Sequence, residues 1–214
     1  MSDEEKLLER LTAYLSDDQK HTLRIYGHGA SGKSTFARKL QLILGEERAN
    51  LLATDPYVIV GEYRDLLSSK DFPHQKVTAC LPAVHELSSL ERDIRALQSG
   101  LDILTIGTAW ASSLRLSAQK PILIVEGMSA AFLPKGLFDL SICFYTDEET
   151  ELERRLARDT AVRGRNMHWI RQTHTSRRQQ YEHYYKLYQE EADILISQAG
   201  ENFKIDKISN GLGK

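Results

Sequence analysis

One short stretch of the chain has the residue types and spacing needed to bind a phosphate group. The segment GHGASGKST (residues 27–35) fits the pattern G-x-x-x-x-G-K-[ST]. Glycines let backbone N–H groups turn toward a polyanion, the lysine reaches the β/γ-phosphates and the hydroxyl after it ligates Mg²⁺. The alternative is a glycine-rich turn that happens to precede a lysine. We expect nucleotide contacts from the whole loop: Gly27, His28, Gly29, Ala30, Ser31, Gly32, Lys33, Ser34 and Thr35.

Two carboxylates follow apolar stretches that are predicted to form buried strands. Asp55 comes after NLLAT (50–54), and Glu126 comes after PILIV (121–125). Ligands of an open parallel sheet bind at the carboxyl ends of its strands. One carboxylate there is suited to take the proton of an acceptor hydroxyl, and the other to hold Mg²⁺ directly or through water, together with Ser34. The alternative is that both are ordinary turn residues.

An arginine-rich segment, ERRLARDTAVRGRN (153–166), is the third chemical feature. Guanidinium groups stabilise the charge on a transferring phosphoryl group, and a lid that carries them also excludes water. The alternative is a solvated charged helix face, which the spacing of Glu151 and Arg155 partly supports. The segment contains Arg154, Arg155, Arg158, Arg163 and Arg165.

Alternating apolar strands and amphipathic helices must position these groups. The phosphate-binding segment lies between a strand, HTLRIYG (21–27), and a helix that ends at Gly45. Further strands are predicted at NLLAT, PILIVEG, DLSICFYT (139–146) and ADILIS (192–197). This alternation predicts an α/β fold with a parallel sheet.

Other helices are predicted at the N-terminus, over about 85–98, after residue 146 and over about 167–189. Ser2 with Glu5, and Thr146 with Glu149, have the spacing of capping boxes. The long last helix carries a tyrosine stripe that is more typical of core packing than of base stacking. That stripe consists of Tyr181, Tyr184, Tyr185 and Tyr188.

The composition narrows the functional class. A chain of 214 residues that is 41% hydrophobic suits one globular domain over 1–214. A net charge of −2 argues against a nucleic-acid surface, and no apolar run approaches the length of a membrane span. The acidic start does not resemble a signal peptide, so a cytoplasmic protein is expected. Cys80 and Cys143 fit no disulfide or metal spacing and are predicted to be reduced thiols.

The chain resembles the uridine kinase and phosphoribulokinase family, which also includes bacterial pantothenate kinases. The resemblance is carried by GHGASGKS, TDPY (54–57), VEG (125–127), FDLSICFYTDEET (138–150) and RRLARDTAVRGR (154–165). It implies an α/β fold of the P-loop NTPase kind, a three-layer αβα sandwich with a mainly parallel sheet. It further implies that Asp55 is the general base and that Glu126 belongs to the Mg²⁺ site. In the lid (about 154–166), Arg158 and Arg163 are expected to act in catalysis, Arg165 on the nucleotide and Arg155 on the acceptor.

The acceptor-side segment (about 56–118) departs from the uridine kinase pattern. Ala83 stands where that pattern has an acidic residue after a proline, and Thr108-Ala109 replaces a tyrosine–aspartate pair. For His85 and Trp110, core packing is an equally good interpretation. A different acceptor pocket is expected from Tyr57, His85, Glu86 and Trp110.

The predicted function is an ATP-dependent kinase that phosphorylates a hydroxyl of a small metabolite, uridine kinase-like with an altered acceptor pocket. The alternatives are a pantothenate or sugar-type kinase of the same family, or a non-catalytic nucleotide-binding regulatory protein. ATP and Mg²⁺ are the expected cofactors and a small molecule the expected acceptor, with neither nucleic acid nor membrane as partner; a homo-oligomer stays open. Uridine and cytidine are predicted to be poor acceptors.

Overall fold

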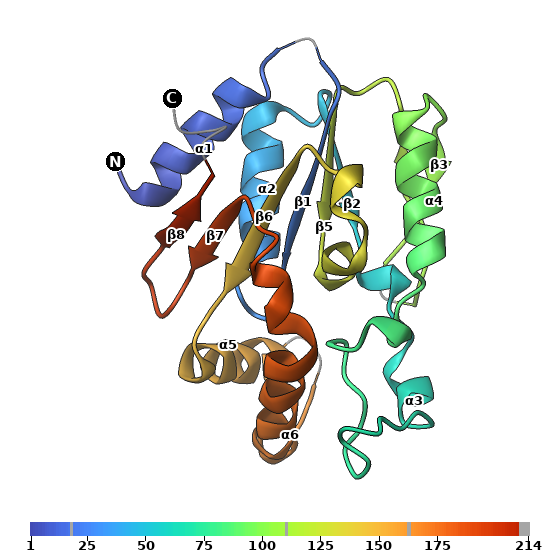
Figure 1. Cartoon of the computed structure of the whole chain (residues 1–214), viewed down its shortest axis with the longest axis vertical. Coiled ribbons are helices and arrows are strands. Elements are labelled where there is room, and N and C mark those ends of the chain that lie inside the picture. The colour runs from blue at the N-terminus through green and yellow to red at the C-terminus, as the bar shows by residue number, and fades with distance from the viewer. Residues whose placement is uncertain (18, 110, 162–163, 210–214) are drawn as a thin grey trace.

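A six-stranded sheet forms the centre of the molecule in a computed structural model that describes residues 1–17, 19–109, 111–161 and 164–209 (Figure 1). Its strand order is β2-β5-β1-β6-β7-β8. All neighbouring strands are parallel except β7 and β8. The strands are β1 (His21–Gly27), β2 (Ala49–Ala53), β5 (Ile122–Glu126), β6 (Leu140–Tyr145), β7 (Ile194–Ser197) and β8 (Lys204–Ile208). The mainly parallel sheet predicted from the sequence is confirmed.

Helices cover both faces of this sheet and complete the three-layer sandwich (Figure 1). One face packs on α1 and α2 through a core that includes Leu11, Leu23 and Phe36. The opposite face packs on α4 and on the C-terminal helical segment through a core that includes Tyr26 and Leu90. The helices are α1 (Asp3–Tyr14), α2 (Lys33–Leu44), α3 (Gly61–Arg64), α4 (Leu87–Gln98), α5 (Glu148–Ala161) and α6 (Met167–Gln180).

The two predicted capping boxes have different outcomes. At the start of α1, the Ser2 side chain accepts from the N–H of Glu5, and the Glu5 carboxylate accepts from the N–H of Ser2. The box predicted at Thr146 is wrong. The Thr146 hydroxyl donates to the carbonyl of Gln198 at 2.8 Å. Asp147 caps α5 instead, because its carboxylate accepts from the Thr150 N–H at 2.8 Å.

The acceptor-side segment is mostly irregular between residues 56 and 82. It contains a short 3₁₀ turn at Asp55–Tyr57 and the four-residue helix α3. Helix α4 starts at Leu87, two residues later than predicted, because the Glu86 N–H donates to the carbonyl of Tyr57. A short antiparallel hairpin forms between β3 (Ile103–Leu104) and β4 (Arg115–Leu116).

The predicted helix over 167–189 is not regular throughout. After α6, the chain forms a π-helical turn over Tyr181–Tyr185 and a 3₁₀ turn over Lys186–Gln189. The π-turn helps to place the hydroxyl of Tyr185, which accepts from the N–H of Gly27 at 3.2 Å and donates to the carbonyl of Met128 at 3.1 Å. Tyr181 and Tyr185 are buried, so the prediction that the tyrosine stripe packs in the core is confirmed.

Both cysteines, Cys80 and Cys143, are buried and free. Among the described residues, no helix is both long enough and apolar enough to cross a membrane. The same part of the chain contains no group of three or more His, Cys, Asp or Glu side chains arranged to hold a metal ion.

Candidate active site

The phosphate-binding segment connects β1 directly to α2. Gly27 ends the strand and Lys33 begins the helix, so strand, loop and helix occur in the predicted order. The loop needs left-handed backbone at Gly32 (φ 92°) and, without a glycine, at Ala30 (φ 65°). At Gly27 (φ 148°), a Cβ atom would collide with the carbonyl oxygen of Phe144 on the neighbouring strand. These dihedrals are typical of a loop whose N–H groups point inward.

Lys33 and Ser34 both contact Glu126 at the end of β5. The Lys33 Nζ lies 3.6 Å from Glu126 Oε1, and the Ser34 hydroxyl donates to the same oxygen at 2.9 Å. The sheet register explains this convergence, because Glu126 pairs with Ile25 of β1 and with Ala53 of β2. Strand ends that are widely separated in sequence therefore meet beside the loop.

Asp55 lies at the same edge of the sheet, two residues beyond the end of β2. Its side chain is exposed and makes no ion pair with a described residue. The backbone around it is fixed, since the Thr54 N–H donates to the carbonyl of Glu126 at 2.7 Å. A Cβ atom on Gly127 would collide with the Thr54 hydroxyl, so the two strand ends approach as closely as glycine allows.

The residues present fit a magnesium-bound nucleotide. A serine hydroxyl and a carboxylate are the hard oxygen ligands that Mg²⁺ prefers, and here Ser34 and Glu126 supply them side by side. Within the loop, the buried Ser31 hydroxyl has no hydrogen-bond partner among the described residues. A phosphate oxygen would satisfy such a group.

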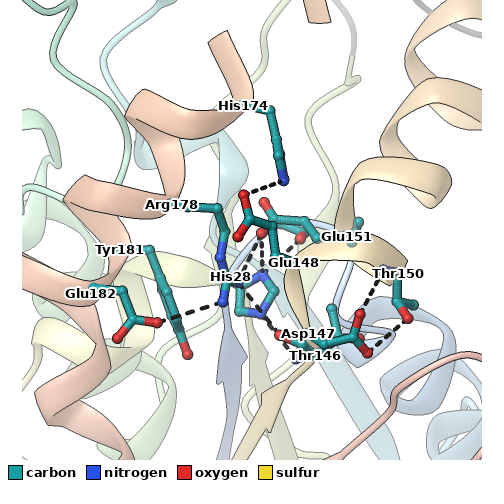
Figure 2. A network of polar contacts seen from close by, with 12 residues as sticks. His28, Thr146, Asp147, Glu148, Thr150, Glu151, His174, Arg178, Tyr181 and Glu182 are labelled. Carbon is teal, nitrogen blue, oxygen red and sulfur yellow. Dashed lines mark hydrogen bonds and ion pairs between the residues drawn. The ribbon is translucent and has the colours of Figure 1, made fainter. Parts of the chain in front are cut away.

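The loop is held from behind by His28, the second residue of the motif (Figure 2). Nε2 of His28 accepts from the Thr146 N–H at 3.0 Å. The ring proton therefore sits on Nδ1, which lies 2.9 Å from the carbonyl of Gly29 and 3.6 Å from a Glu151 carboxylate oxygen. Burial lowers the pKa of His28, although Glu151 opposes this effect. The His28 ring is therefore neutral, and it supports the loop from behind.

A buried ion pair between α5 and α6 completes this support (Figure 2). Arg178 donates to Glu151 at 3.0 Å, and the side chains of both residues are shielded from solvent. Arg178 also lies over the ring of Tyr181, 4.8 Å from its centre, and 3.5 Å from a Glu182 oxygen. The Tyr181 ring in turn packs edge-on against His28. Arg178 near the end of α6 and Tyr181 directly after it thus connect the C-terminal helical segment to the phosphate-binding segment, far away in sequence.

The predicted lid arginines divide between α5 and the chain that follows it. Arg155 is 1% exposed and donates to Nδ1 of His174 at 3.1 Å; burial lowers its pKa to about 10. Arg158 is half-exposed and donates to Asp159 at 2.8 Å. Arg165 lies 5.2 Å from the centre of the Trp169 ring. Arg163 falls outside the described residues.

The predicted acceptor residues differ in how accessible they are. Tyr57 is fully buried, and its hydroxyl donates to Asp93 at 2.6 Å. His85 is buried between Ser129 Oγ (2.8 Å) and the Ala79 carbonyl (2.9 Å), and burial lowers its pKa to about 4. These placements favour the packing interpretation for His85. Glu86 is exposed, and Trp110 lies outside the described residues.

Comparison with known proteins identifies the family to which this fold belongs. The model of the phosphoribulokinase / uridine kinase family matches residues 23–204. The chain belongs to this family. It is 26% identical to uridine-cytidine kinase B of Dictyostelium discoideum, over 83% of this chain and 74% of that one. It is 27% identical to a uridine kinase of Shewanella amazonensis, over 88% and 92%. Phosphoribulokinase from Rhodobacter spheroides has the same fold, with a TM-score of 0.61 at 17% identity over 85% and 71%.

Membership of this kinase family agrees with the resemblance seen in the sequence. The family consists of ATP-dependent kinases that act on small molecules, and its members use ATP and typically Mg²⁺. The P-loop fold predicted from the sequence is confirmed.

Several residues that shape this candidate site carry no clear signal in the sequence. Glu151 and Arg178 lie 27 positions apart and carry no local signature of their pairing. In the sequence Arg154 is one arginine among several, yet its Nη1 donates to the carbonyl of Ala30 inside the loop at 3.2 Å. The one available signal was helical spacing, because Arg154 lies three residues after Glu151 on α5 and therefore near the same helix face.

Proposed function

We propose that the chain is an ATP-dependent kinase that transfers the γ-phosphoryl group to a hydroxyl of a small metabolite, with uridine kinase-like chemistry and an altered acceptor pocket. The observation that carries this proposal is the convergence of Lys33 and Ser34 on Glu126, beside the strand end that bears Asp55. The phosphate-binding segment (27–35), the acceptor-side segment (56–118) and the arginine segment (154–166) act as one kinase unit.

On the nucleotide side, the loop N–H groups and Lys33 bind the phosphates. Ser34 and Glu126 hold Mg²⁺, which neutralises charge on the phosphate oxygens when it is bound. The ion pair between Lys33 and Glu126 keeps the ammonium at the loop before the nucleotide arrives. Arg158 and Arg163 supply guanidinium groups for the charge that develops on the transferred group, and Arg165 contacts the nucleotide.

On the acceptor side, Asp55 accepts the proton of the acceptor hydroxyl. The acceptor oxygen forms a bond to the γ-phosphorus, the bond from that phosphorus to the bridging oxygen breaks, and ADP leaves with the electron pair. The proton ends on the Asp55 carboxylate. The absence of an ion pair between Asp55 and any described residue leaves this carboxylate accessible for that role.

The test is Asp55→Asn, which keeps the shape of the side chain and removes its basicity. We expect kcat to fall by roughly 10²–10⁴-fold while Mg-ATP affinity stays within about twofold. Asp65→Asn is the matched control, because Asp65 is exposed and pairs with Lys76. If the Asp55→Asn variant retains most of kcat, Asp55 is a turn residue and not the general base. Mg-ATP binding without ATP consumption, whatever acceptor is offered, would instead support the non-catalytic alternative.

A further inference from the structure

Three arginine side chains from three separate elements have guanidinium groups that the protein leaves incompletely paired. Arg64 ends α3, Arg155 lies on α5 and Arg177 lies on α6. Arg64 Nε and Arg155 Nη2 are buried without a hydrogen-bond partner among the described residues. The Arg177 side chain makes no ion pair with any residue that the structure describes. Buried guanidinium N–H groups without acceptors are costly, so an anion close to this cluster would lower its free energy.

These arginines lie close enough to influence one another. Burial lowers the pKa of Arg64, and the next largest cause is the charge of Arg177. Burial also lowers the pKa of Arg155 to about 10, again followed by the charge of Arg177. Arg177 is therefore a neighbour of both, and the repulsion between like charges raises the free energy of the cluster unless an anion compensates it.

The carboxylates near this cluster are already engaged. Glu151 pairs with Arg178 at 3.0 Å, and Asp65, the residue after Arg64, pairs with Lys76 at 2.5 Å. Asp159 accepts from Arg158 at 2.8 Å and lies 3.8 Å from Arg155 Nε. The described carboxylates therefore give Arg64 and Arg177 no direct counter-charge.

The cluster lies on the acceptor side, near the proposed base. The buried His85 ring lies near both Arg64 and Asp55. After the effects of burial and of the bond to Ala79, the charge of Arg64 lowers the pKa of His85 and the charge of Asp55 raises it. In Figure 1, α3 and α6 both lie beyond the carboxyl end of the sheet, where Asp55 is found. An acceptor that reaches from Asp55 toward α6 therefore meets positive charge.

We propose that the acceptor carries an anionic group, a phosphate or a carboxylate, which Arg64 and Arg177 bind while its hydroxyl lies at Asp55. This inference rests on the proposed kinase function. Arginine forks match the oxygens of both anions, and bonds between charged groups are the stronger class of hydrogen bond. Arg155 is too buried to contact the acceptor directly, but its positive charge adds to the attraction for an anion.

The departures from the uridine kinase pattern point the same way. A neutral nucleoside needs acceptors for its sugar hydroxyls, and Ala83 and Ala109 offer no side-chain acceptor. The positions that would bind a sugar are thus depleted of carboxylates, while Arg64 and Arg155 have buried guanidinium nitrogens without a hydrogen-bond partner among the described residues.

The first arm of the test is turnover with Mg-ATP at equal acceptor concentrations. Uridine, cytidine and fructose represent neutral acceptors, D-glycerate and pantothenate represent carboxylates, and ribulose 5-phosphate represents sugar phosphates. We expect kcat/KM for the better of the two anionic classes to exceed that of every neutral acceptor by at least about tenfold. The class that is turned over identifies the source of the negative charge. Efficient turnover of uridine would overturn the proposal and leave the kinase function intact.

The second arm uses Arg64→Gln and Arg177→Gln, with the exposed Arg171→Gln on α6 as the matched control. We expect each test variant to raise KM for the anionic acceptor by about 10- to 100-fold, with Mg-ATP affinity unchanged. Arg177→Lys is expected to recover part of the loss, because it keeps the charge without the fork. Unchanged KM in both glutamine variants would refute the proposal.

If no acceptor of the panel is turned over, a binding measurement tests the proposal instead. With a non-hydrolysable ATP analogue saturating the phosphate-binding loop, inorganic phosphate and D-glycerate are titrated and thermal stabilisation is recorded. We expect at least one of them to stabilise the parent and the Arg171→Gln control, and to stabilise Arg64→Gln and Arg177→Gln less. No stabilisation of the parent by either anion would overturn the proposal. Failure of the analogue itself to bind would count against the kinase function.

Discussion

Removing the Glu151 carboxylate tests the support behind the phosphate-binding segment. Glu151 is 5% exposed and accepts from Arg178, whose side chain is 15% exposed, at 3.0 Å. Truncating one partner of a buried ion pair leaves the other charge uncompensated, at about 3–5 kcal/mol. Arg178 keeps its contacts with Glu182 and the Tyr181 ring, so the lower end of that range applies to Glu151→Ala.

The expected thermal shift follows from the size of the chain. For 214 residues, about 3 kcal/mol lowers Tm by roughly 6–12 °C, since each kcal/mol corresponds to about 2–4 °C. Calorimetry or a dye-based melt measures this shift. Glu153→Ala is the matched control, because Glu153 is exposed on the same helix, and it should change stability by less than about 0.5 kcal/mol.

A double variant separates the cost of an unpaired charge from a loss of packing. Replacing Glu151 by leucine and Arg178 by methionine removes both charges and keeps apolar volume. We expect it to be more stable than Glu151→Ala, because exchange of a whole buried pair for apolar groups is often neutral or stabilising. A loss below about 1 kcal/mol in Glu151→Ala, or a double variant no more stable than the single one, would refute the reasoning.

Three further changes test other parts of the structure. Lys33→Ala should leave the fold intact but abolish turnover and most of the thermal stabilisation that Mg-ATP gives to the parent. Gly27→Ala should cost at least about 1–3 kcal/mol in a melting experiment, because its φ of 148° is strained and its Cβ meets the Phe144 carbonyl; Gly136→Ala, with open space around it, should not. Burial lowers the pKa of His85 from 6.5 to about 4, so the unfolded chain binds a proton that the folded chain excludes between these values. The free energy of unfolding should therefore fall by up to about 3 kcal/mol as pH drops from 6.5 to 4 in urea titrations, and His85→Gln should flatten that slope.

The nucleotide half of the site was predictable because its information is local. The spacing of Gly27, Gly32 and Lys33 predicts a phosphate-binding loop followed by a helix. The structure has the left-handed backbone that such a loop needs, and α2 starts at Lys33. Asp55 and Glu126 were placed at one edge of the sheet because each directly follows an apolar strand, and parallel strands end together. Such inferences need only the order of elements along the chain.

Elements that depend on tertiary contacts were not predictable in the same way. Thr146 has the sequence of a cap, but its hydroxyl bonds to Gln198, a residue that lies more than fifty positions away. The neighbouring Asp147 then caps the helix. Similarly, the helical pattern over 167–189 conceals a π-turn near the point where Tyr185 reaches the Gly27 N–H. In both cases a distant partner outweighed the local preference.

Two adjacent residues of α6 act on the two different sides of the site. Arg178 pairs with Glu151 behind the phosphate-binding segment, whereas Arg177 lies near Arg64 and Arg155. A displacement of α6 would therefore disturb nucleotide and acceptor binding together, but truncating only the Arg177 guanidinium leaves every contact of Arg178 in place. Unchanged Mg-ATP affinity in Arg177→Gln is thus the measurement that separates loss of an acceptor contact from movement of the helix. A parallel loss of both affinities would instead assign Arg177 to the scaffold.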